Sequence, residues 1–320
     1  MLDWTDRHCR FFLRLLSRRA RLYTEMVTAP ALVHGNVARH LDYDAAEHPL
    51  ALQLGGSDPA QLAAAAKIGA RWGYDEINLN CGCPSERVQK GSFGACLMAE
   101  PALVADCVKA MRDAVSLPVT VKHRIGLDRS DDYGFVRDFV GTVAAAGCEV
   151  FIVHARNVVL KGLSPKENRE IPPLRYEVAH RLKRDFPAAT IVVNGGLGGW
   201  EAIGRQWEAA DGVMLGRAAY HDPWLLAELD GRIDGGEAAP RSRGEVLRSL
   251  VPYAERQLAS GVQLRAITRH VLGLFHGVPG GRRYRQILSD PRRLAGATPA
   301  LLEEALAAVE GYAAGPAERN

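Results

Sequence analysis

Between residues 21 and 230, short apolar and β-branched runs alternate with longer alanine-rich stretches of helical periodicity. This alternation predicts a parallel sheet covered by helices, because parallel strands need long crossover connections. The seven predicted strands are Arg21–Met26, Pro49–Leu54, Glu76–Leu79, Pro118–Lys122, Val150–His154, Thr190–Asn194 and Gly212–Leu215. The predicted helices between and after them are Pro59–Trp72, Pro101–Val115, Tyr133–Ala146, Leu174–Phe186, Trp200–Trp207 and Pro223–Leu229.

Polar residues stand at the carboxyl ends of these strands. They are Glu25, Gln53, Asn78, Asn80, Lys122, His154, Asn194 and the pair Gly216-Arg217. Convergence at successive strand ends is typical of a (β/α)8 TIM barrel, where that face holds the active site. A doubly wound sheet usually carries a Gly-rich loop after its first strand, and none is seen here. The predicted fold class is therefore α/β, with a TIM barrel.

One strand of the predicted barrel is missing. The chain begins Met1-Leu2-Asp3 and runs into a helix predicted over Arg7–Arg18, with Asp3 or Thr5 as its N-cap. The first strand of the barrel would lie before Met1. We therefore expect that the start of the chain has been lost or that the barrel closes abnormally.

The composition changes near residue 230. Residues 1–230 are predicted to form the barrel domain, 231–243 a linker rich in Gly, Ala and Pro, and 244–320 a helical domain. The helices predicted there are Gly244–Ser260, Leu264–Leu274, Tyr284–Leu288 and Thr298–Ala313. The run from Gly280 to Arg285 mixes glycine, arginine and tyrosine. It fits either a solvated helical surface or a surface that contacts phosphates.

The cysteines and the charge balance narrow the class of protein. The six cysteines are scattered and no signal sequence precedes them, so we expect a reduced, cytoplasmic protein. Cys81 and Cys83 have no second pair to complete a zinc site, and we predict no metal. No apolar run reaches membrane-spanning length, and a net charge of +3 neither demands nor excludes a polyanionic partner.

Two glycine turns point to phosphate binding. Asn194-Gly195-Gly196 follows one predicted strand, and Leu215-Gly216-Arg217 follows the next. Glycines let backbone N–H groups approach a phosphate, and helix N-termini favour its charge. Either turn alone has a plain steric explanation, but consecutive turns of this kind match the usual phosphate site of a barrel.

Several residues suit a bound cofactor. Lys122 is either a surface lysine or a cation beside an anionic ring, and Gln53 bonds either a heterocycle or a neighbouring loop. His154 is either structural or part of the site. Cys83, in Asn80-Cys81-Gly82-Cys83-Pro84, is either a buried thiol in a tight turn or the acid or nucleophile of the site. The whole set fits a cofactor enzyme, in which a cysteine handles a proton, better than a hydrolase.

Five stretches together resemble one known family. They are Met-Leu-Asp-Trp-Thr-Asp at 1–6, Tyr-Thr-Glu-Met at 23–26, Ala-Leu-Gln-Leu-Gly-Gly at 51–56, the run from Tyr74 to Ser85, and the run from Gly162 to Leu174. From Met1 to about residue 310 the chain closely resembles the tRNA-dihydrouridine synthases, and within them the bacterial A-type group. The family implies an FMN-bearing barrel, a helical RNA-binding domain and NADPH as reductant.

The resemblance assigns roles to individual residues. Cys83 matches the catalytic cysteine, which would give a proton to C5 of uracil while FMN N5 delivers hydride to C6. The implied FMN contacts are Met1, Leu2, Gln53, Lys122, His154, Asn194, Gly195, Gly196, Gly216 and Arg217. The implied tRNA contacts are Asn80, Lys166, Arg169, Arg282 and Arg285. The implied substrate is the D-loop of tRNA at positions 20 and 20a, and a monomer without protein partners would suffice.

The chain departs from the family at three places. An apolar strand and an Ala-Pro pair normally precede the residue that is Met1 here, and a misassigned start codon is our favoured explanation. His123 replaces a small polar residue and is expected to alter loop packing. Cys81 replaces an apolar residue and is expected to face the barrel wall.

Two other functions remain open at the level of sequence. One is an FMN barrel that acts on free pyrimidines, like dihydroorotate or dihydropyrimidine dehydrogenases. The other is a catalytically idle tRNA-binding protein, if the shortened start prevents flavin binding.

Overall fold

A computed structural model of the chain describes residues 1–233 and 242–313. These residues form two compact units. The sheet unit comprises Met1–Leu2, Tyr23–Tyr43 and Pro49–Gly216. The helical unit comprises Asp3–Leu22, Asp44–His48 and the described residues from Arg217 onward. Each unit is therefore built from segments that are far apart in the sequence.

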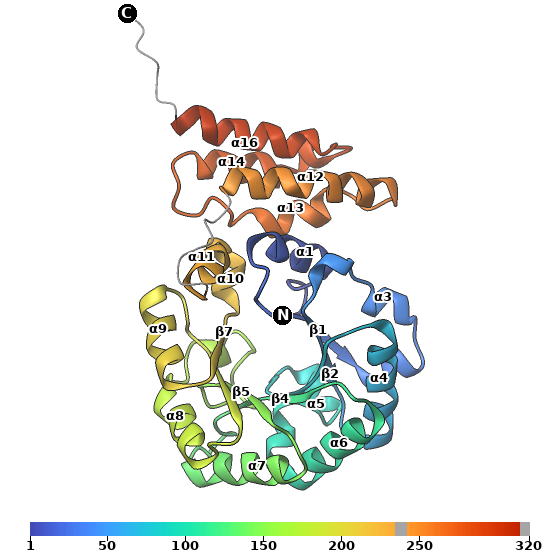
Figure 1. Cartoon of the computed structure of the whole chain (residues 1–320), viewed down its shortest axis with the longest axis vertical. Helices are drawn as coiled ribbons and strands as arrows, with labels where there is room; N and C mark the ends of the chain where they lie inside the picture. Colours follow the sequence, from blue (N-terminus) through green and yellow to red (C-terminus); the bar gives the residue numbers. More distant parts are fainter. Residues whose placement is uncertain (234–241, 314–320) are drawn as a thin grey trace, which may run out of the picture. The chain divides into compact units, whose positions relative to one another are not determined.

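The sheet unit holds seven strands in the order in which they occur in the chain. They are β1 (Leu22–Thr28), β2 (Leu50–Gly55), β3 (Glu76–Cys81), β4 (Val119–Arg124), β5 (Val150–His154), β6 (Thr190–Asn194) and β7 (Gly212–Met214). The pairs from β2 to β7 are parallel. The predicted α/β class with a parallel sheet is confirmed, and the curved sheet is visible in Figure 1.

Helices cover the outer face of the sheet, as Figure 1 shows. The longer ones are α4 (Pro59–Trp72), α6 (Pro101–Ala114), α7 (Tyr133–Ala145), α8 (Tyr176–Asp185) and α9 (Trp200–Ala209). The sheet unit also holds the short helices α2 (Ala29–Val33), α3 (Val37–Leu41) and α5 (Glu86–Lys90). Local signals set the ends of α4: Asp58 caps its start, and Gly73 ends it with a φ of 101°. Its buried Leu62 and Ala65 pack toward the strands, where Leu52 and Leu54 are also buried.

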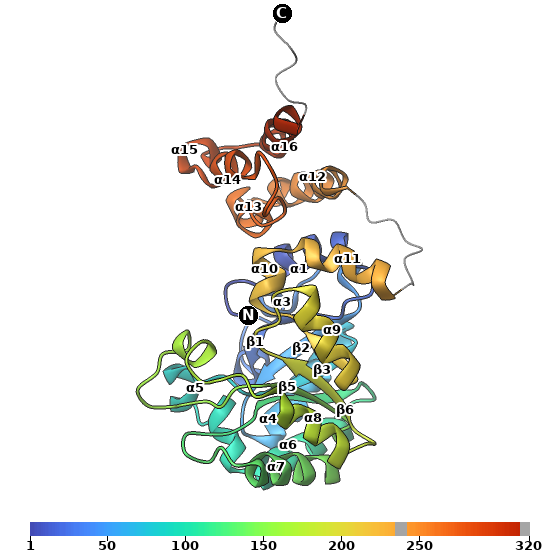
Figure 2. The same cartoon turned by 90° about the vertical axis from the view of Figure 1, so that its left-hand side faces the viewer.

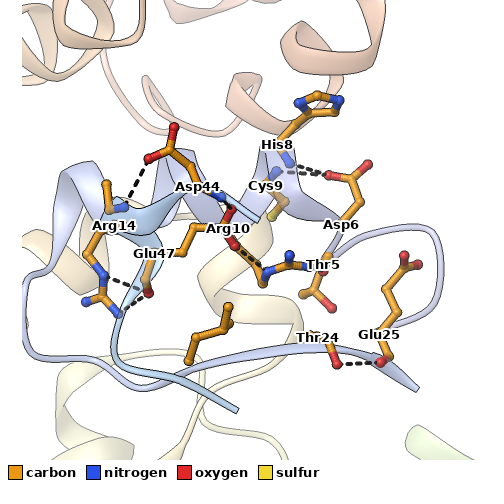
Figure 3. Close-up of polar contacts among 12 residues, drawn as sticks. Thr5, Asp6, His8, Cys9, Arg10, Arg14, Thr24, Glu25, Asp44 and Glu47 are labelled. Atoms are coloured by element: carbon orange, nitrogen blue, oxygen red, sulfur yellow. Dashed lines mark hydrogen bonds and ion pairs between the residues drawn. The ribbon is translucent and has the colours of Figure 1, made fainter. Parts of the chain in front are cut away.

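The helical unit begins with α1 (Arg7–Leu16). Asp6 caps this helix by accepting hydrogen bonds from the backbone of His8 and Cys9 at 3.0 Å, as Figure 3 shows, so the expected cap at Asp3 or Thr5 is wrong. Arg10 forms a buried ion pair with Glu47 at 2.6 Å. The remaining helices are α10 (Arg217–His221), α11 (Trp224–Ile233), α12 (Arg243–Ala259), α13 (Arg265–Val271), α14 (Gly281–Ser289), α15 (Pro291–Leu294) and α16 (Ala300–Ala313).

Helix α1 packs against α12 within the helical unit. The Phe11 and Tyr253 rings stack with centroids 3.8 Å apart, and the Tyr253 hydroxyl meets Nδ1 of His8 at 2.7 Å. Most of the predicted linker, residues 234–241, lies outside the described residues. The predicted domain boundaries therefore stay a prediction. In the described ranges, the helices lack the combination of length and apolar character that a bilayer span requires.

Candidate active site at the carboxyl ends of the strands

Cys83 lies in a turn that Asn80 holds at the end of β3. The Asn80 Oδ1 accepts hydrogen bonds from the backbone N–H groups of Gly82 and Cys83, both at 3.0 Å. Gly94 has a φ of 74°, and a Cβ there would stand 2.7 Å from the Cys83 carbonyl oxygen. This glycine lets the next backbone approach closely, and the Ala95 N–H donates to that carbonyl at 3.0 Å. The turn is thus fixed from both sides.

The two cysteines of this segment differ in environment. Cys81 is fully buried, and burial raises the pKa of its thiol well above the usual value. Cys83 is only partly buried, and its Sγ lies 3.7 Å from the Ser85 hydroxyl. An acid that acts on a bound ligand must be reachable, so the geometry favours Cys83 over Cys81.

Two amide side chains line up beside this turn. The Asn80 Nδ2 donates to the Gln53 Oε1 at 2.9 Å, and the Gln53 Nε2 donates to the Asn78 Oδ1 at 2.8 Å. Their strands are neighbours, with Gln53 of β2 paired in register with Asn78 of β3. The structure therefore brings the predicted flavin contact Gln53 and the predicted tRNA contact Asn80 together.

Lys122 and Asn194 form a second polar pair. The Lys122 Nζ on β4 donates to the Asn194 Oδ1 on β6 at 3.1 Å, and the Asn194 Nδ2 donates to the Met214 carbonyl at 2.8 Å. Burial lowers the pKa of Lys122 to about 8, and the positive charge of Arg124 contributes to this lowering. A cation in such a position is stabilised by a bound anion.

The turn after β6 requires glycine at two adjacent positions. Gly195 and Gly196 have φ values of 114° and 68°. A Cβ at Gly196 would approach the Leu174 Cδ1 to 2.4 Å, and one at Gly195 would stand 3.3 Å from the His154 ring. His154 is in register with Asn194, so the strand end, the histidine and the turn are neighbours. A cation beside a glycine turn fits an anionic cofactor such as a flavin phosphate.

The remaining predicted flavin contacts belong to both units: Met1, Leu2 and Gly216 to the sheet unit, and Arg217 to the helical unit. Gly216 follows β7, and a Cβ there would stand 3.8 Å from the Sδ of Met1 in the same unit. Leu2 is 72% exposed. Arg217 is the first residue of α10 and belongs to the helical unit.

Arg124 ties the cysteine turn to the segment between β5 and α8. Its guanidinium donates to the carbonyls of Gly82 at 3.3 Å, Asn157 at 3.1 Å and Asn168 at 2.8 Å. The fully buried Asn168 side chain bonds the backbone of Val159 in both directions, at 2.7 and 2.8 Å. Sequence reasoning assigned no role to either residue. Their side-chain types gave a signal, since a buried arginine or asparagine must satisfy its polar atoms.

The same segment carries two predicted tRNA contacts. Lys166 and Arg169 are exposed around the 3₁₀ turn η3 (Glu167–Arg169). Figure 2 shows α5 beside this segment at the left of the view, and the Gln89 Nε2 on α5 donates to the Leu160 carbonyl at 3.2 Å. The segment that holds the two cations is thus linked to the cysteine turn through the side chains of Arg124 and Gln89.

Two further predicted tRNA contacts lie on α14 of the helical unit. Tyr284, Ile287 and Leu288 form its buried face. Arg282 and Arg285 are exposed, and their spacing of three residues places them on one side of the helix.

His123 is fully buried. Its ring lies 5.2 Å from that of Phe139 on α7 and 5.9 Å from that of Phe151 on β5, and burial lowers its pKa to about 4. Its Nδ1 meets the Arg124 carbonyl at 2.6 Å. His123 therefore packs between strand and helix as a neutral ring.

Comparisons with known proteins agree on one family. Residues 1–310 match the family model described as Dihydrouridine synthase (Dus). The chain is 62% identical over 289 residues to a tRNA-dihydrouridine(20/20a) synthase of Pseudomonas aeruginosa, covering 90% of this chain and 87% of that one. It is 58% identical over 307 residues to the synthase of that name from Salmonella typhimurium, covering 96% and 92%. The chain therefore belongs to the dihydrouridine synthase family.

Proposed function

We propose that this protein reduces uridine to 5,6-dihydrouridine in the D-loop of tRNA, at positions 20 and 20a. Its relatives are named tRNA-dihydrouridine(20/20a) synthases, and their similarity spans 90% or more of the chain. We further propose FMN as the bound cofactor and NADPH as the reductant. The seven parallel strands are proposed to represent a (β/α)8 barrel, with the place of the eighth strand between β7 and β1.

The arrangement of Asn80 carries this proposal. Its Nδ2 bonds Gln53, the predicted flavin contact, while its Oδ1 holds the backbone of Cys83, the predicted acid. Reduction of a carbon–carbon double bond needs a hydride source and a proton source that both reach one base. Asn80 bonds both the predicted flavin contact and the backbone of the predicted acid, which supports a site where the two sources meet one base.

The residues at the strand ends would hold FMN. Lys122 and the turn Asn194-Gly195-Gly196 suit its negative charge, and Gln53 and His154 suit its ring. Gly216, Arg217, Met1 and Leu2 are proposed as further contacts. When bound, FMN supplies hydride to C6 of the uracil.

Cys83 would then protonate C5 of the base. Its partly buried thiol stands on a turn that backbone bonds hold in place, which suits a proton donor better than a mobile loop does. A uridine in folded tRNA is stacked, so the base must leave its stack to reach this thiol. Asn80 is proposed to contact the extruded base.

The basic residues would hold the RNA. Lys166 and Arg169 of the sheet unit, and Arg282 and Arg285 of the helical unit, are exposed and suit phosphate contacts. Such contacts give affinity and orientation without reading the sequence.

A direct assay tests this function. The full-length protein is incubated with FMN, NADPH and unmodified tRNA, and dihydrouridine is measured by mass spectrometry of nucleosides. We expect dihydrouridine at positions 20 and 20a, and none there in a matched tRNA that carries cytidine at both positions. Reduction of free uracil, with tRNA untouched, would favour an enzyme of pyrimidine metabolism. A colourless protein that binds tRNA without reducing it would favour an idle binding protein.

A further inference from the structure

Side-chain hydrogen bonds join Asn80, Gln53, Asn78 and Thr120 in a row, which we call the amide relay. A buried carboxylate, Glu76, lies at the end of this relay that is farther from Cys83. Glu76 on β3 is 2% exposed. Its Oε1 accepts a hydrogen bond from the Tyr23 hydroxyl at 2.9 Å and one from the Thr120 hydroxyl at 2.6 Å. A carboxylate has no hydrogen to donate, so both hydroxyls must point toward it.

The direction of these hydrogen bonds determines which atom of each following side chain donates and which accepts. Because the Thr120 hydrogen points at Glu76, its Oγ1 accepts from the Asn78 Nδ2, at 2.8 Å. The Asn78 Oδ1 is then left to accept from the Gln53 Nε2 at 2.8 Å, and the Gln53 Oε1 accepts from Asn80 at 2.9 Å. Each amide is thus oriented by its neighbour.

The hydrogen bonds of Asn80, at the other end of the relay, require the same donor and acceptor assignment. Two backbone N–H groups, of Gly82 and Cys83, donate to the Asn80 Oδ1, which leaves its Nδ2 to face Gln53. Reversal of the relay at Glu76 would therefore place two amide N–H groups against each other between Gln53 and Asn80. The two ends agree only while residue 76 is an acceptor.

We infer that Glu76 is a positioning residue, which acts through Thr120 and Asn78 to fix the amides of Gln53 and Asn80. The inference rests on the proposed function, in which these two amides meet the flavin and the base. With the relay bonds fixed, a ligand meets the second N–H of each amide. The pair therefore suits carbonyl oxygens, which both a flavin ring and a uracil carry.

Four variants separate this role from general stability. Thr120→Val removes the relay hydroxyl with little change of shape, whereas Thr120→Ser keeps the hydroxyl and loses only the methyl group. Glu76→Met keeps the length of the side chain but removes the oxygen that accepts from Tyr23 and Thr120. Thr190→Val makes the same hydroxyl-to-methyl change on β6, outside the relay, and is the matched control.

The first readout needs neither ligand nor activity. In the flavin-free full-length protein, the side-chain amide signals of Gln53, Asn78 and Asn80 are followed by nuclear magnetic resonance. We expect Thr120→Val and Glu76→Met to shift all three sets of signals, and Thr120→Ser and Thr190→Val to leave them in place. Unchanged signals in both relay variants would overturn the inference.

The second readout is flavin affinity and turnover. Loss of one oriented hydrogen bond is expected to raise the FMN dissociation constant about three- to tenfold in Thr120→Val and Glu76→Met. At saturating FMN we expect kcat to fall while KM for tRNA stays within about twofold, since the phosphate contacts are untouched. Equal losses in Thr120→Ser and Thr120→Val, with equal falls in melting temperature, would show a structural role and overturn the inference.

The outcomes also distinguish the two proposals. A wild-type protein that neither binds FMN nor modifies tRNA would refute the proposed function, while the amide signals would still report on the relay. A wild-type enzyme that is active, with relay variants that match it in signals, affinity and turnover, would refute the role of Glu76 alone.

Discussion

At the scale of single residues, position on the strand end separates two cysteines that are two residues apart. Cys81 ends β3 with its side chain fully buried, whereas Cys83 lies on the turn beyond it and is partly exposed. The same chemical group is therefore a core side chain in one case and a candidate acid in the other.

Replacement of each thiol tests this difference. Cys83→Ala is expected to keep FMN bound and to lower kcat by about 10²- to 10⁴-fold, the usual contribution of a general acid. Cys81→Ala, the matched control, should cost about 1–2 kcal/mol of stability through lost packing and leave turnover per bound flavin unchanged. Flavin absorbance and dihydrouridine formation measure the two effects. Full activity of Cys83→Ala would remove this residue from the mechanism.

The lowered pKa of Lys122 predicts a pH dependence of flavin binding. Below its folded pKa of about 8 the side chain is charged and attracts an anion, and this attraction is lost as the pH rises through that value. We expect FMN affinity to fall between about pH 7 and pH 9 in the wild type. Lys122→Met should bind weakly at every pH, and Lys109→Met, an exposed lysine on α6, should follow the wild type.

The contribution of Lys122 to the stability of the flavin-free protein should increase as the pH rises, whereas FMN affinity should fall. The folded pKa lies below the ordinary 10.5, so the unfolded chain binds more protons at Lys122 between pH 8 and 10.5. This group therefore adds stability as the pH rises through that window, by up to about 1.4 kcal/mol per pH unit. Denaturant titrations of the wild type and Lys122→Met at two pH values in the window measure the difference.

At the scale of elements, α14 holds the exposed Arg282 and Arg285 on a well-anchored helix. Its Tyr284 is fully buried and donates from its hydroxyl to the Val271 carbonyl at 3.1 Å. The buried face fixes the direction in which Arg282 and Arg285 point into solvent.

Loss of both arginines tests the proposed RNA contact. Arg282→Ala with Arg285→Ala should weaken tRNA binding and reduce the slope of log affinity against log salt by about 1–2, because each phosphate contact releases a counterion. Arg137→Ala, which removes an exposed arginine from α7, is the control and should leave the slope unchanged. Equal slopes in all three proteins would exclude Arg282 and Arg285 from the interface.

Much of the sheet could be predicted from sequence because its signals are local. Apolar runs such as Val150–His154 report a strand directly, and the structure gives the same bounds. The cap of α1 was missed because Asp3, Thr5 and Asp6 are all plausible caps, and only the geometry of the turn selects Asp6.

The bonds that organise the site were harder to predict. The partners of Arg124 and Asn168 come from loops that are distant in sequence, and the direction of the amide relay depends on Glu76. A buried polar residue must have hydrogen-bond partners, but its type alone does not identify which residues they are. The roles of the individual site residues therefore stay predictions.

At the scale of the whole molecule, the helical unit is assembled from both ends of the chain. Tyr253 of α12 is 1% exposed and packs on Phe11 of α1, more than 200 residues earlier in the sequence. This contact joins segments that no local sequence signal connects.

Two substitutions at Tyr253 measure the strength of that junction. Tyr253→Ala should lower the free energy of unfolding by about 3–5 kcal/mol, because a large buried ring is lost. Tyr253→Phe keeps the ring and loses only the bond to His8, so about 1 kcal/mol is expected. Tyr312→Ala on α16, where the side chain is 68% exposed, should be neutral. Equal losses in both Tyr253 variants would contradict packing as the main contribution.

The same junction has a consequence for synthesis on the ribosome. Helix α1 emerges well before α12, with Phe11, Phe12 and Leu16 among its buried residues in the finished protein. Its partner Tyr253 follows more than 200 residues later, roughly ten seconds or more at ordinary elongation rates. During that interval the nascent chain exposes an apolar helix that cannot yet fold into place. Chaperone capture of the segment that holds α1 is therefore expected during synthesis.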